Sequence, residues 1–456
     1  MAVETAQVVQ RIWARDGGLW TGADEDQWLG WLDEPSRIRE RIPELESFAQ
    51  SVHEAGLRDV VLAGMGGSSL APEVIRRTFE SESFHVLDTT HPDAIRALEG
   101  RLDLERTLFL VASKSGSTLE TQCHLAYFWE KVGRRGDRFA AITDPGSALE
   151  RQARERDFRA IWDGEPTIGG RYSALSVFGI VPAALIGVDL ERFLLRAHEM
   201  VEACRSEDGN PGLELGIELG RGWRDGRDKV LINPDANGFG LWAEQLLAES
   251  TGKRGRGLVP VPGESDEGSD RQSAEVRLTH PYELGQEFYR WEFATAVAGA
   301  LIEINPFDQP NVQEAKDRTS AILESEDEPR LETVGSLDEL VAQAEPGDYL
   351  CVQAFVNPTP AAERVLAALR ERVRREAGVV TTGGFGPRYL HSTGQLHKGG
   401  PPSGLFLQVV DEPDELAIPE KPFGFRKLIR AQAAGDFDAL RERGRRVARI
   451  RWEEIE

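Results

Sequence analysis

The sequence predicts an α/β protein of two domains, each with a mainly parallel sheet flanked by helices. Apolar, β-branched runs of strand length alternate with amphipathic segments of helix length, which is typical of parallel strands joined by crossover helices. The chain of 456 residues is also long enough to bury two or three cores of roughly 150 residues each. Two α/β domains are the simplest arrangement that accounts for both observations.

The predicted strands fall into two sets. The first set lies between residues 59 and 164, and a less regular set lies between residues 229 and 410. Their members are 59–65, 84–90, 107–113, 138–144 and 158–164, then 229–234, 257–262, 348–358, 378–384 and 404–410. Helical patterns at 173–205 and 211–224 are expected to join the domains, and the polar stretch 263–275 is expected to be a surface loop.

The domain boundaries follow from these patterns. We expect an N-terminal helical segment over 1–50, a first α/β domain over 51–205, a second over 206–410 and a helical tail over 411–456. Glutamates intersperse the basic run of that tail, which predicts a solvated helix face. The run consists of Arg441, Arg443, Arg445, Arg446, Arg449 and Arg451.

Composition argues against several classes of protein. The formal net charge of −23 disfavours nucleic acid or an anionic membrane as a partner. No stretch approaches the roughly 20 apolar residues of a membrane span, and the first residues lack the features of a signal peptide, so we expect a cytoplasmic protein. Cys123, Cys204 and Cys351 are widely spaced and predict neither a disulfide framework nor a zinc site.

A glycine-rich turn follows the first predicted strand, in VLAGMGGSSLAPEV at 61–74. Gly67 and Ser68 precede a helix, and free backbone NH groups at the positive end of a helix favour an anion. One candidate is a dinucleotide pyrophosphate, with Asp88 as the acid that binds the ribose, although Ser69 stands where that fingerprint has Gly or Ala. The other interpretation is a tight turn without a ligand.

A second turn of this kind, SKSGSTLET at 113–121, directly follows another predicted strand. Four hydroxyls and a lysine at the start of a helix make a cradle for a phosphomonoester, whereas a helix cap needs only one or two hydroxyls. The cradle residues are Ser113, Lys114, Ser115, Ser117 and Thr118. The two turns together predict one site for a sugar phosphate, with the sugar beside Gly67 and Ser68.

Five segments, in this order, resemble the glucose-6-phosphate isomerase family and its sugar-isomerase fold. They are GMGGSSLAP, SKSGSTLET, GGRYSALSVFG, AESTGK at 248–253 and INPFDQPNVQEAK at 304–316. The amino-acid sequence of these segments is most similar to that of the isomerase half of bifunctional transaldolase/glucose-6-phosphate isomerases. The resemblance implies reversible conversion of glucose 6-phosphate and fructose 6-phosphate through a cis-enediolate, with no metal or other cofactor.

The resemblance also implies roles for particular side chains. Glu249 matches the glutamate that moves a proton between C2 and C1, and a partly buried carboxylate can have its pKa raised toward neutrality. Arg171 corresponds to the arginine that faces the enediolate, where a permanent cation stabilises the developing charge. Gln309 corresponds to a glutamine that contacts substrate, and Lys316 to a lysine near the ring oxygen.

The histidine that opens the sugar ring departs from the usual order of the family. Only His280 lies between the glutamate segment and the FDQ segment, and its context does not match. Instead YLHSTGQLHKGGP follows at 389–401, so His391 is the displaced equivalent and His397 its rival. In the family this histidine reaches the site of the neighbouring subunit, which implies a homodimer with shared sites.

Three alternatives stay open. An isomerase of the same type could also accept mannose 6-phosphate, which the sequence does not separate from strict glucose specificity. A non-catalytic sugar-phosphate-binding module would keep the serine turn but could lose Glu249 and Arg171. An NAD-dependent oxidoreductase would use Asp88 and would not require Glu249.

Overall fold

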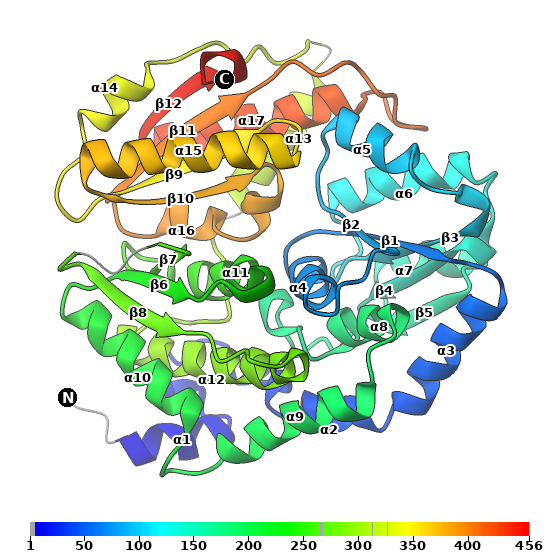
Figure 1. Ribbon diagram of the computed structural model, residues 1–456, viewed down its shortest axis with the longest axis horizontal. Helices are drawn as coiled ribbons and strands as arrows, with labels where there is room; N and C mark the ends of the chain where they lie inside the picture. The colour runs from blue at the N-terminus through cyan, green and yellow to red at the C-terminus, as the bar shows by residue number, and fades with distance from the viewer. Residues whose placement is uncertain (1–4, 265–267, 312, 326, 456) are drawn as a thin grey trace.

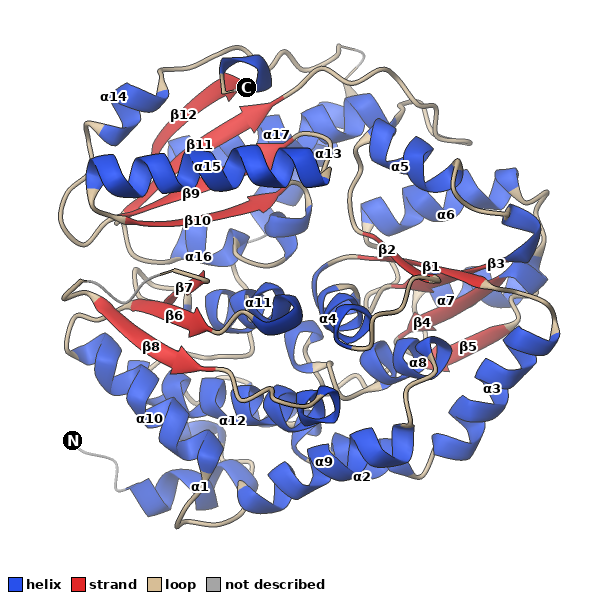
Figure 2. Ribbon diagram, viewed as in Figure 1, coloured by secondary structure: helices blue, strands red, loops and turns tan. Residues whose placement is uncertain are grey.

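The computed structural model describes residues 5–264, 268–311, 313–325 and 327–455, and these form three sheets with helices on their faces (Figures 1 and 2). All neighbouring strands within the three described sheets run parallel. The predicted α/β class with parallel sheets is therefore confirmed.

The first predicted set of strands forms a sheet of five. Its strands are β1 (Asp59–Gly64), β2 (Phe84–Leu87), β3 (Thr107–Ala112), β4 (Phe139–Thr143) and β5 (Ala160–Asp163). Their order is β2-β1-β3-β4-β5. Since β1 and β3 are direct neighbours, the glycine turn after β1 and the serine turn after β3 leave the same edge of the sheet.

Helices cover both faces of this sheet because successive side chains of a strand point to opposite faces. On β1, Val60 and Leu62 belong to one apolar cluster, whereas Val61 between them belongs to another. The first cluster includes α3 (Ile42–Glu54), α4 (Leu70–Thr78) and α8 (Val177–Ile186), and the second includes α5 (Pro92–Glu99), α6 (Leu119–Lys131) and α7 (Ala148–Glu155).

The second predicted set of strands divides into two sheets. The smaller contains β6 (Lys229–Asn233), β7 (Val259–Pro262) and β8 (Arg271–Glu275), and the larger contains β9 (Tyr349–Phe355), β10 (Val380–Phe385), β11 (Gly404–Val410) and β12 (Arg446–Arg451). Their orders are β7-β6-β8 and β10-β9-β11-β12. One apolar cluster joins them, with Leu231 and Val259 from the smaller sheet and Cys351 and Val380 from the larger.

The expectation of a surface loop over 263–275 is wrong for its last part. Residues 271–275 form β8, which pairs with β6 at an edge of the smaller sheet. Only Gln272 and Ala274 are buried, and the residues beside them face solvent more openly. A strand with one covered face and few apolar residues has the composition of a loop. Residues 265–267 of the stretch lie outside the described part of the chain.

The expectation of helices alone after Asp411 is also wrong. The helix α17 (Phe425–Glu442) is followed by β12, which pairs with β11. In β12, Ala448 and Ile450 enter the apolar cluster of the sheet, while the buried Arg449 donates to the Gln408 side chain at 2.6 Å. The three arginines of β12, at 446, 449 and 451, hide the strand pattern because their charges are neutralised or hydrogen-bonded only in the folded chain.

The predicted solvated face of arginines is right for Arg441 and Arg443, which are exposed, and wrong for the later arginines of the run, which are at least partly buried. Arg445 donates to the carbonyl oxygens of Pro401, Lys398 and Gly400. Arg446 forms a bidentate pair with Asp348, at 2.6 and 2.8 Å. These arginines bind the protein's own backbone and acids.

Further helices complete the layers, and the helical patterns predicted at 173–205 and 211–224 are confirmed by α8, α9 and α10. The remaining helices are α1 (Thr5–Trp13), α2 (Glu34–Arg39), α9 (Leu190–Ala203), α10 (Pro211–Arg224), α11 (Phe239–Thr251), α12 (Leu284–Ile302), α13 (Gln313–Glu324), α14 (Leu337–Val341), α15 (Pro360–Ala377) and α16 (Gly394–Gly399). Within the described ranges, no helix is both long and apolar enough to cross a bilayer.

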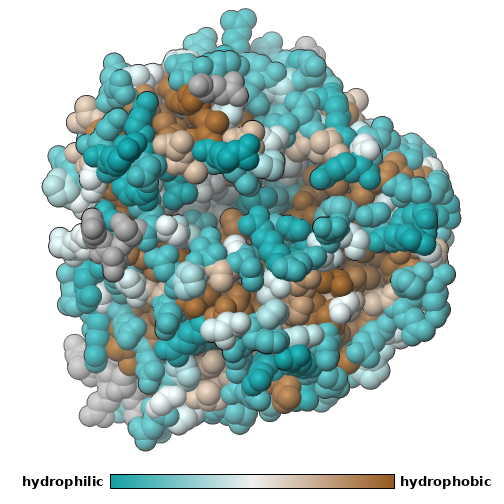
Figure 3. All heavy atoms as spheres, viewed as in Figure 1, coloured by the Kyte–Doolittle hydropathy of each residue, from teal (hydrophilic) through white to brown (hydrophobic). Residues whose placement is uncertain are grey.

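The contact between α4 and α11 brings the first sheet and the smaller sheet together. In Figure 1 these two helices lie side by side at the centre of the view, between the five-stranded sheet on the right and the two sheets on the left. Hydrophilic residues cover most of the face in Figure 3, with hydrophobic residues gathered in patches between them. The predicted site residues lie on segments that meet near this central contact.

Candidate active site

A cavity of about 580 Å³ lies at the carboxyl ends of β1 and β3. Its lining includes ten of the predicted site residues: Gly67, Ser68, Lys114, Ser115, Thr118, Arg171, Glu249, Gln309, Lys316 and His391. Ser117 lines an adjoining cavity of about 270 Å³, which shares Ser115, Thr118, Lys316 and His391 with the first. Ser113 lines neither cavity, and its hydroxyl lies 2.9 Å from the Thr118 hydroxyl behind the lining.

The glycine turn after β1 allows three segments to approach one another closely. Gly66 has a φ of +55°, and a Cβ there would lie 2.6 Å from the His391 carbonyl oxygen. A Cβ on Gly67 would lie 2.0 Å from the Gly170 carbonyl oxygen, nearer than atoms can pack. The turn therefore requires glycine for steric reasons. The backbone at His391 packs against one side of it, and the backbone next to Arg171 packs against the other.

The serine turn lies at the N-terminus of α6, where backbone NH groups and the helix dipole favour an anion. The Ser115 and Ser117 hydroxyls lie 3.0 Å apart. The Lys114 ammonium donates to Asp144 at 2.6 Å and to the Glu165 carbonyl at 2.9 Å. Lys114 thus lines the cavity with its charge already paired, while the hydroxyls of the turn face the space beside it.

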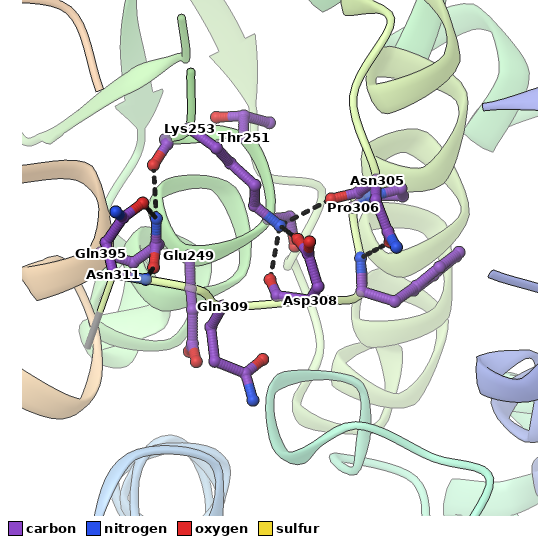
Figure 4. Close-up of polar contacts among 12 residues, drawn as sticks. Glu249, Thr251, Lys253, Asn305, Pro306, Asp308, Gln309, Asn311 and Gln395 are labelled. Carbon is purple, nitrogen blue, oxygen red and sulfur yellow. Dashed lines mark hydrogen bonds and ion pairs between the residues drawn. The ribbon is translucent and has the colours of Figure 1, made fainter. Parts of the chain in front are cut away.

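Arg171 and Glu249 face each other across the cavity wall. Arg171 lies in the short helical turn Gly170–Tyr172, and its guanidinium is buried, with 2% of the side chain exposed. Its Nη1 atom lies 3.4 Å from Glu249 Oε1 and donates to Gln309 Oε1 at 2.9 Å. In Figure 4 the side chains of Glu249 and Gln309, which come from different segments, project toward the same side. A carboxylate, a fixed cation and an amide therefore converge at one place.

Gln245 links Glu249 to the segment of His391. Gln245 precedes Glu249 by one turn of α11, and its Nε2 atom donates to Glu249 Oε2 and to the His391 carbonyl, both at 2.9 Å. Because the amide holds one carboxylate oxygen, the other oxygen of Glu249 faces Arg171. Gln245 also lines the cavity.

His391 lies beside Glu120 of the same chain, with Nε2 2.8 Å from Glu120 Oε1. Burial opposes ionisation of the Glu120 carboxyl, but His391 and Lys316 outweigh it and lower the pKa of Glu120 to about 2. The Gln432 amide also donates to Glu120 Oε1, at 2.7 Å. An ionised Glu120 accepts a hydrogen bond from Nε2–H and leaves Nδ1 of the ring for a ligand.

His397 and Asp88 do not share this arrangement. His397 is buried between Tyr389 and Phe406, and its Nδ1 lies 3.2 Å from the Gln353 amide. Burial lowers the pKa of His397 well below its usual value, so the ring stays neutral. Asp88 accepts two hydrogen bonds of 2.7 Å from Arg388, one on each carboxylate oxygen. Its carboxylate is therefore already paired and is not presented to a ribose.

Comparison with known proteins adds to this geometry. A family model described as phosphoglucose isomerase matches residues 36–210. A glucose-6-phosphate isomerase of Cyanothece sp. is 30% identical over an alignment of 290 residues, and the match covers 56% of this chain and 54% of that protein. One of Carboxydothermus hydrogenoformans is 28% identical over an alignment of 399 residues, and the match covers 65% of this chain and 85% of that protein. The resemblance to glucose-6-phosphate isomerases is confirmed.

The extent of the match differs along the chain. The chain spans about half the length of the Cyanothece relative. The family model covers the glycine turn, the serine turn and Arg171, whereas Glu249 and His391 lie outside it. A solved glucose-6-phosphate isomerase from Chlamydia trachomatis is 18% identical, covers 80% of this chain and 81% of its own, and has a TM-score of 0.53. That likeness shows a shared fold.

The structure adds two groups to the site that the sequence did not single out, Glu120 and Gln245. Glu120 belongs to the serine-turn motif, two residues after Thr118, but its partner is 271 residues away. Gln245 stands four residues before Glu249, a spacing that places both on one face of a helix. That spacing is the one signal that could have indicated Gln245.

In the part of the chain that the structure describes, no group of three or more His, Cys, Asp or Glu side chains is suited to hold a metal ion.

Proposed function

We propose that the protein is a glucose-6-phosphate isomerase, which interconverts glucose 6-phosphate and fructose 6-phosphate. One observation carries the proposal: Glu249, Arg171 and His391 line the same cavity as the hydroxyls of the serine turn. A base, a fixed cation and an imidazole are the groups that aldose–ketose isomerisation requires. The cavity volume of about 580 Å³ is within the usual range for small-molecule sites.

The serine turn is the proposed anchor for the phosphate. Ser115, Ser117 and Thr118 present hydroxyls at the N-terminus of α6, and Lys316 faces the same space. Hydroxyl and amide donors at a helix N-terminus bind a phosphate dianion without a bound metal. A phosphate held there leaves the sugar carbons directed toward Gly67 and Ser68, within the cavity that Glu249 lines.

His391 is the proposed group for ring opening. Its imidazole donates a proton to the ring oxygen and takes up the proton that the hydroxyl on the anomeric carbon loses, so the ring C–O bond breaks and a carbonyl forms. The pairing of Nε2 with Glu120 supports this role because it orients the imidazole and leaves Nδ1 for the substrate.

Glu249 is the proposed base for the proton transfer. Starting from glucose 6-phosphate, its carboxylate removes the C2 proton, and the C1 carbonyl becomes the oxyanion of an enediolate. The proton of the C2 hydroxyl then passes to O1, and the same carboxyl group returns its proton to C1 as the C2 carbonyl forms. No electron acceptor is needed, because one carbon is oxidised as its neighbour is reduced. The Arg171 guanidinium, 3.4 Å from Glu249 Oε1, is suited to stabilise the enediolate charge.

Assembly and location are further proposals. We infer a cytoplasmic homodimer from the resemblance, and the three free, buried cysteines are compatible with a reducing compartment. Whether the protein also accepts mannose 6-phosphate can be tested with that epimer in the coupled assay described next.

A coupled assay of the purified chain on fructose 6-phosphate tests the proposal. Glu249→Gln should abolish measurable isomerisation while a sugar-phosphate analogue still binds, because the amide keeps the shape of the side chain but is not a base. Glu191→Gln, at an exposed side chain of α9, is the matched control and should retain activity. Wild-type protein that binds fructose 6-phosphate without turnover would instead favour a binding module, and retained turnover in Glu249→Gln would remove the base assignment.

A further inference from the structure

We propose that Lys253 is a positioning residue for this reaction. Its buried ammonium holds the segment 305–309 in the conformation that fixes the Arg171 guanidinium and presents Gln309 to the cavity. The inference rests on the proposed function, since it concerns the geometry of the groups assigned to the enediolate. Lys253 itself is not part of the cavity lining, so it acts through its neighbours.

The Lys253 ammonium uses all three of its protons on this segment. Only 3% of the side chain is exposed. Its Nζ atom donates to the Asn305 carbonyl at 2.6 Å, to the Asp308 carbonyl at 2.5 Å and to the Asp308 carboxylate at 2.5 Å. Figure 4 shows the lysine reaching from the end of α11 to the backbone of the segment, while Glu249 and Gln309 project elsewhere.

Arg171 binds the same few residues from the other side. Its Nη2 atom donates to the Pro306 carbonyl at 2.7 Å and to the Asp308 carbonyl at 2.9 Å. The Asp308 carbonyl oxygen therefore accepts hydrogen bonds from both cations. Because Arg171 Nη1 also holds Gln309 Oε1 at 2.9 Å, the position of this backbone sets the position of the guanidinium and of the amide together.

The chain just after this segment, at Asn311, has an anchor of its own. The Gln395 side chain accepts from the Asn311 backbone NH and donates to the Gly252 carbonyl, both at 2.8 Å. Gly252 is adjacent to Lys253 in the chain, so one short turn after α11 holds the segment at two points. Removal of the lysine leaves the anchor at Asn311 and frees the part that contacts Arg171.

Charges of both signs act on the Lys253 ammonium. Arg171 repels it, and the Asp308 and Glu249 carboxylates attract it. A side chain without an amino group would leave the Asp308 carboxylate and the Asn305 carbonyl without the donor that Lys253 supplies, and the Asp308 carbonyl with Arg171 alone. These groups would then turn toward Arg171 or water. The arginine would then lose its fixed direction toward the cavity, while the phosphate anchor on α6 would be unaffected.

Lys253→Met tests the inference, with Lys229→Met as the matched control. Lys229 is also a buried lysine, with 2% of its side chain exposed and an ion pair of 2.7 Å to Asp228, but it starts β6 and lies outside the cavity. We expect Lys253→Met to lower kcat about 100-fold, the typical cost of a 1 Å misplacement at a reacting centre, with KM changed less than about threefold. The kcat and KM of Lys229→Met should equal those of wild type.

Two further measurements separate positioning from general loss of structure. Combined with Arg171→Ala, Lys253→Met should cause no additional loss of kcat, because both act through the guanidinium. The Lys253→Met variant should also bind a hydroxamate analogue of the enediolate more weakly than wild type does. It should bind a hexitol 6-phosphate as tightly as wild type does. If Lys253→Met does not fold, Lys253→Gln carries the same comparisons.

The inference is wrong if the double variant loses kcat additively, or if both ligands weaken equally. It is also wrong if Lys229→Met shows the same loss of kcat as Lys253→Met. A wild-type chain without isomerase activity would instead count against the proposed function, and the two-ligand comparison would still report whether Lys253 positions Arg171.

Discussion

The Nε2 atom of His391 lies 2.8 Å from the Oε1 atom of Glu120 in the same chain. The family resemblance implies a histidine that crosses from a neighbouring subunit, but here the displaced His391 lines the cavity of its own chain. Shared sites are therefore not required by this geometry, whatever the assembly.

Coexpression of two inactive variants tests this arrangement. We expect Glu249→Gln and His391→Ala, purified together, to show no more activity than either alone, because each chain lacks one group of its own site. In a dimer with shared sites, random pairing would restore about a quarter of the wild-type activity. Recovery near that level would contradict the single-chain site, and coexpression of wild type with Glu249→Gln provides the control for expression.

Glu120→Gln should weaken ring opening. The amide lacks the negative charge that pairs with the imidazole and fixes its orientation, so we expect turnover of ring-closed fructose 6-phosphate to fall about 10- to 100-fold. Proton exchange on an open-chain substrate, followed by NMR in deuterated water, should change much less. Equal losses in both measurements would indicate that Glu120 has a structural role only.

The stability of the protein should depend on Lys253 in a particular pH window. Burial and the nearby Arg171 lower the pKa of Lys253 from its ordinary 10.5 to about 7. Between these values the unfolded chain binds more protons than the folded chain, so this group makes the free energy of unfolding rise with pH.

Urea unfolding at pH 7 and pH 9.5 measures this contribution. The free energy of unfolding of wild type relative to Lys253→Met should increase over that interval by at most about 3 kcal/mol. An identical change in both proteins would show that Lys253 is protonated throughout.

Gly67→Ala should disturb the site through its backbone. A Cβ at Gly67 would lie 2.0 Å from the Gly170 carbonyl oxygen, so the segment that carries Arg171 must move. We expect kcat to fall by roughly 100-fold and the melting temperature to drop. Gly100→Ala is the control, because its Cβ would lie no nearer than 3.3 Å to another atom, and its activity should stay near wild type.

Much of this fold could be predicted because parallel strands buried on both faces are strongly apolar. The runs that became β1, β3 and β9 follow that rule, whereas β8 and β12 do not. In β8 only Gln272 and Ala274 are buried, and in β12 the buried Arg449 depends on Gln408, 41 residues away. The polarity of such strands is compensated by partners that lie elsewhere in the sequence.

The site divides in the same way. The two turns and Arg171 carry their chemistry in local motifs, so the sequence indicates them directly. Glu120 depends on His391, and Lys253 on Asp308, through contacts that only the tertiary structure creates. Ser113 shows the converse case, since its motif suggested a ligand but its hydroxyl serves Thr118.

The placement of β12 bears on how the chain can assemble during translation. All five strands of the first sheet have been synthesised by Asp163, so that sheet can close while the ribosome is still elongating. The larger sheet must wait for residues 446–451, and until then β11 has an open edge and Asp348 lacks its arginine. A nascent chain stalled within α17 would thus carry a complete first sheet with its serine turn beside an unfinished sheet, a form prone to chaperone binding or aggregation.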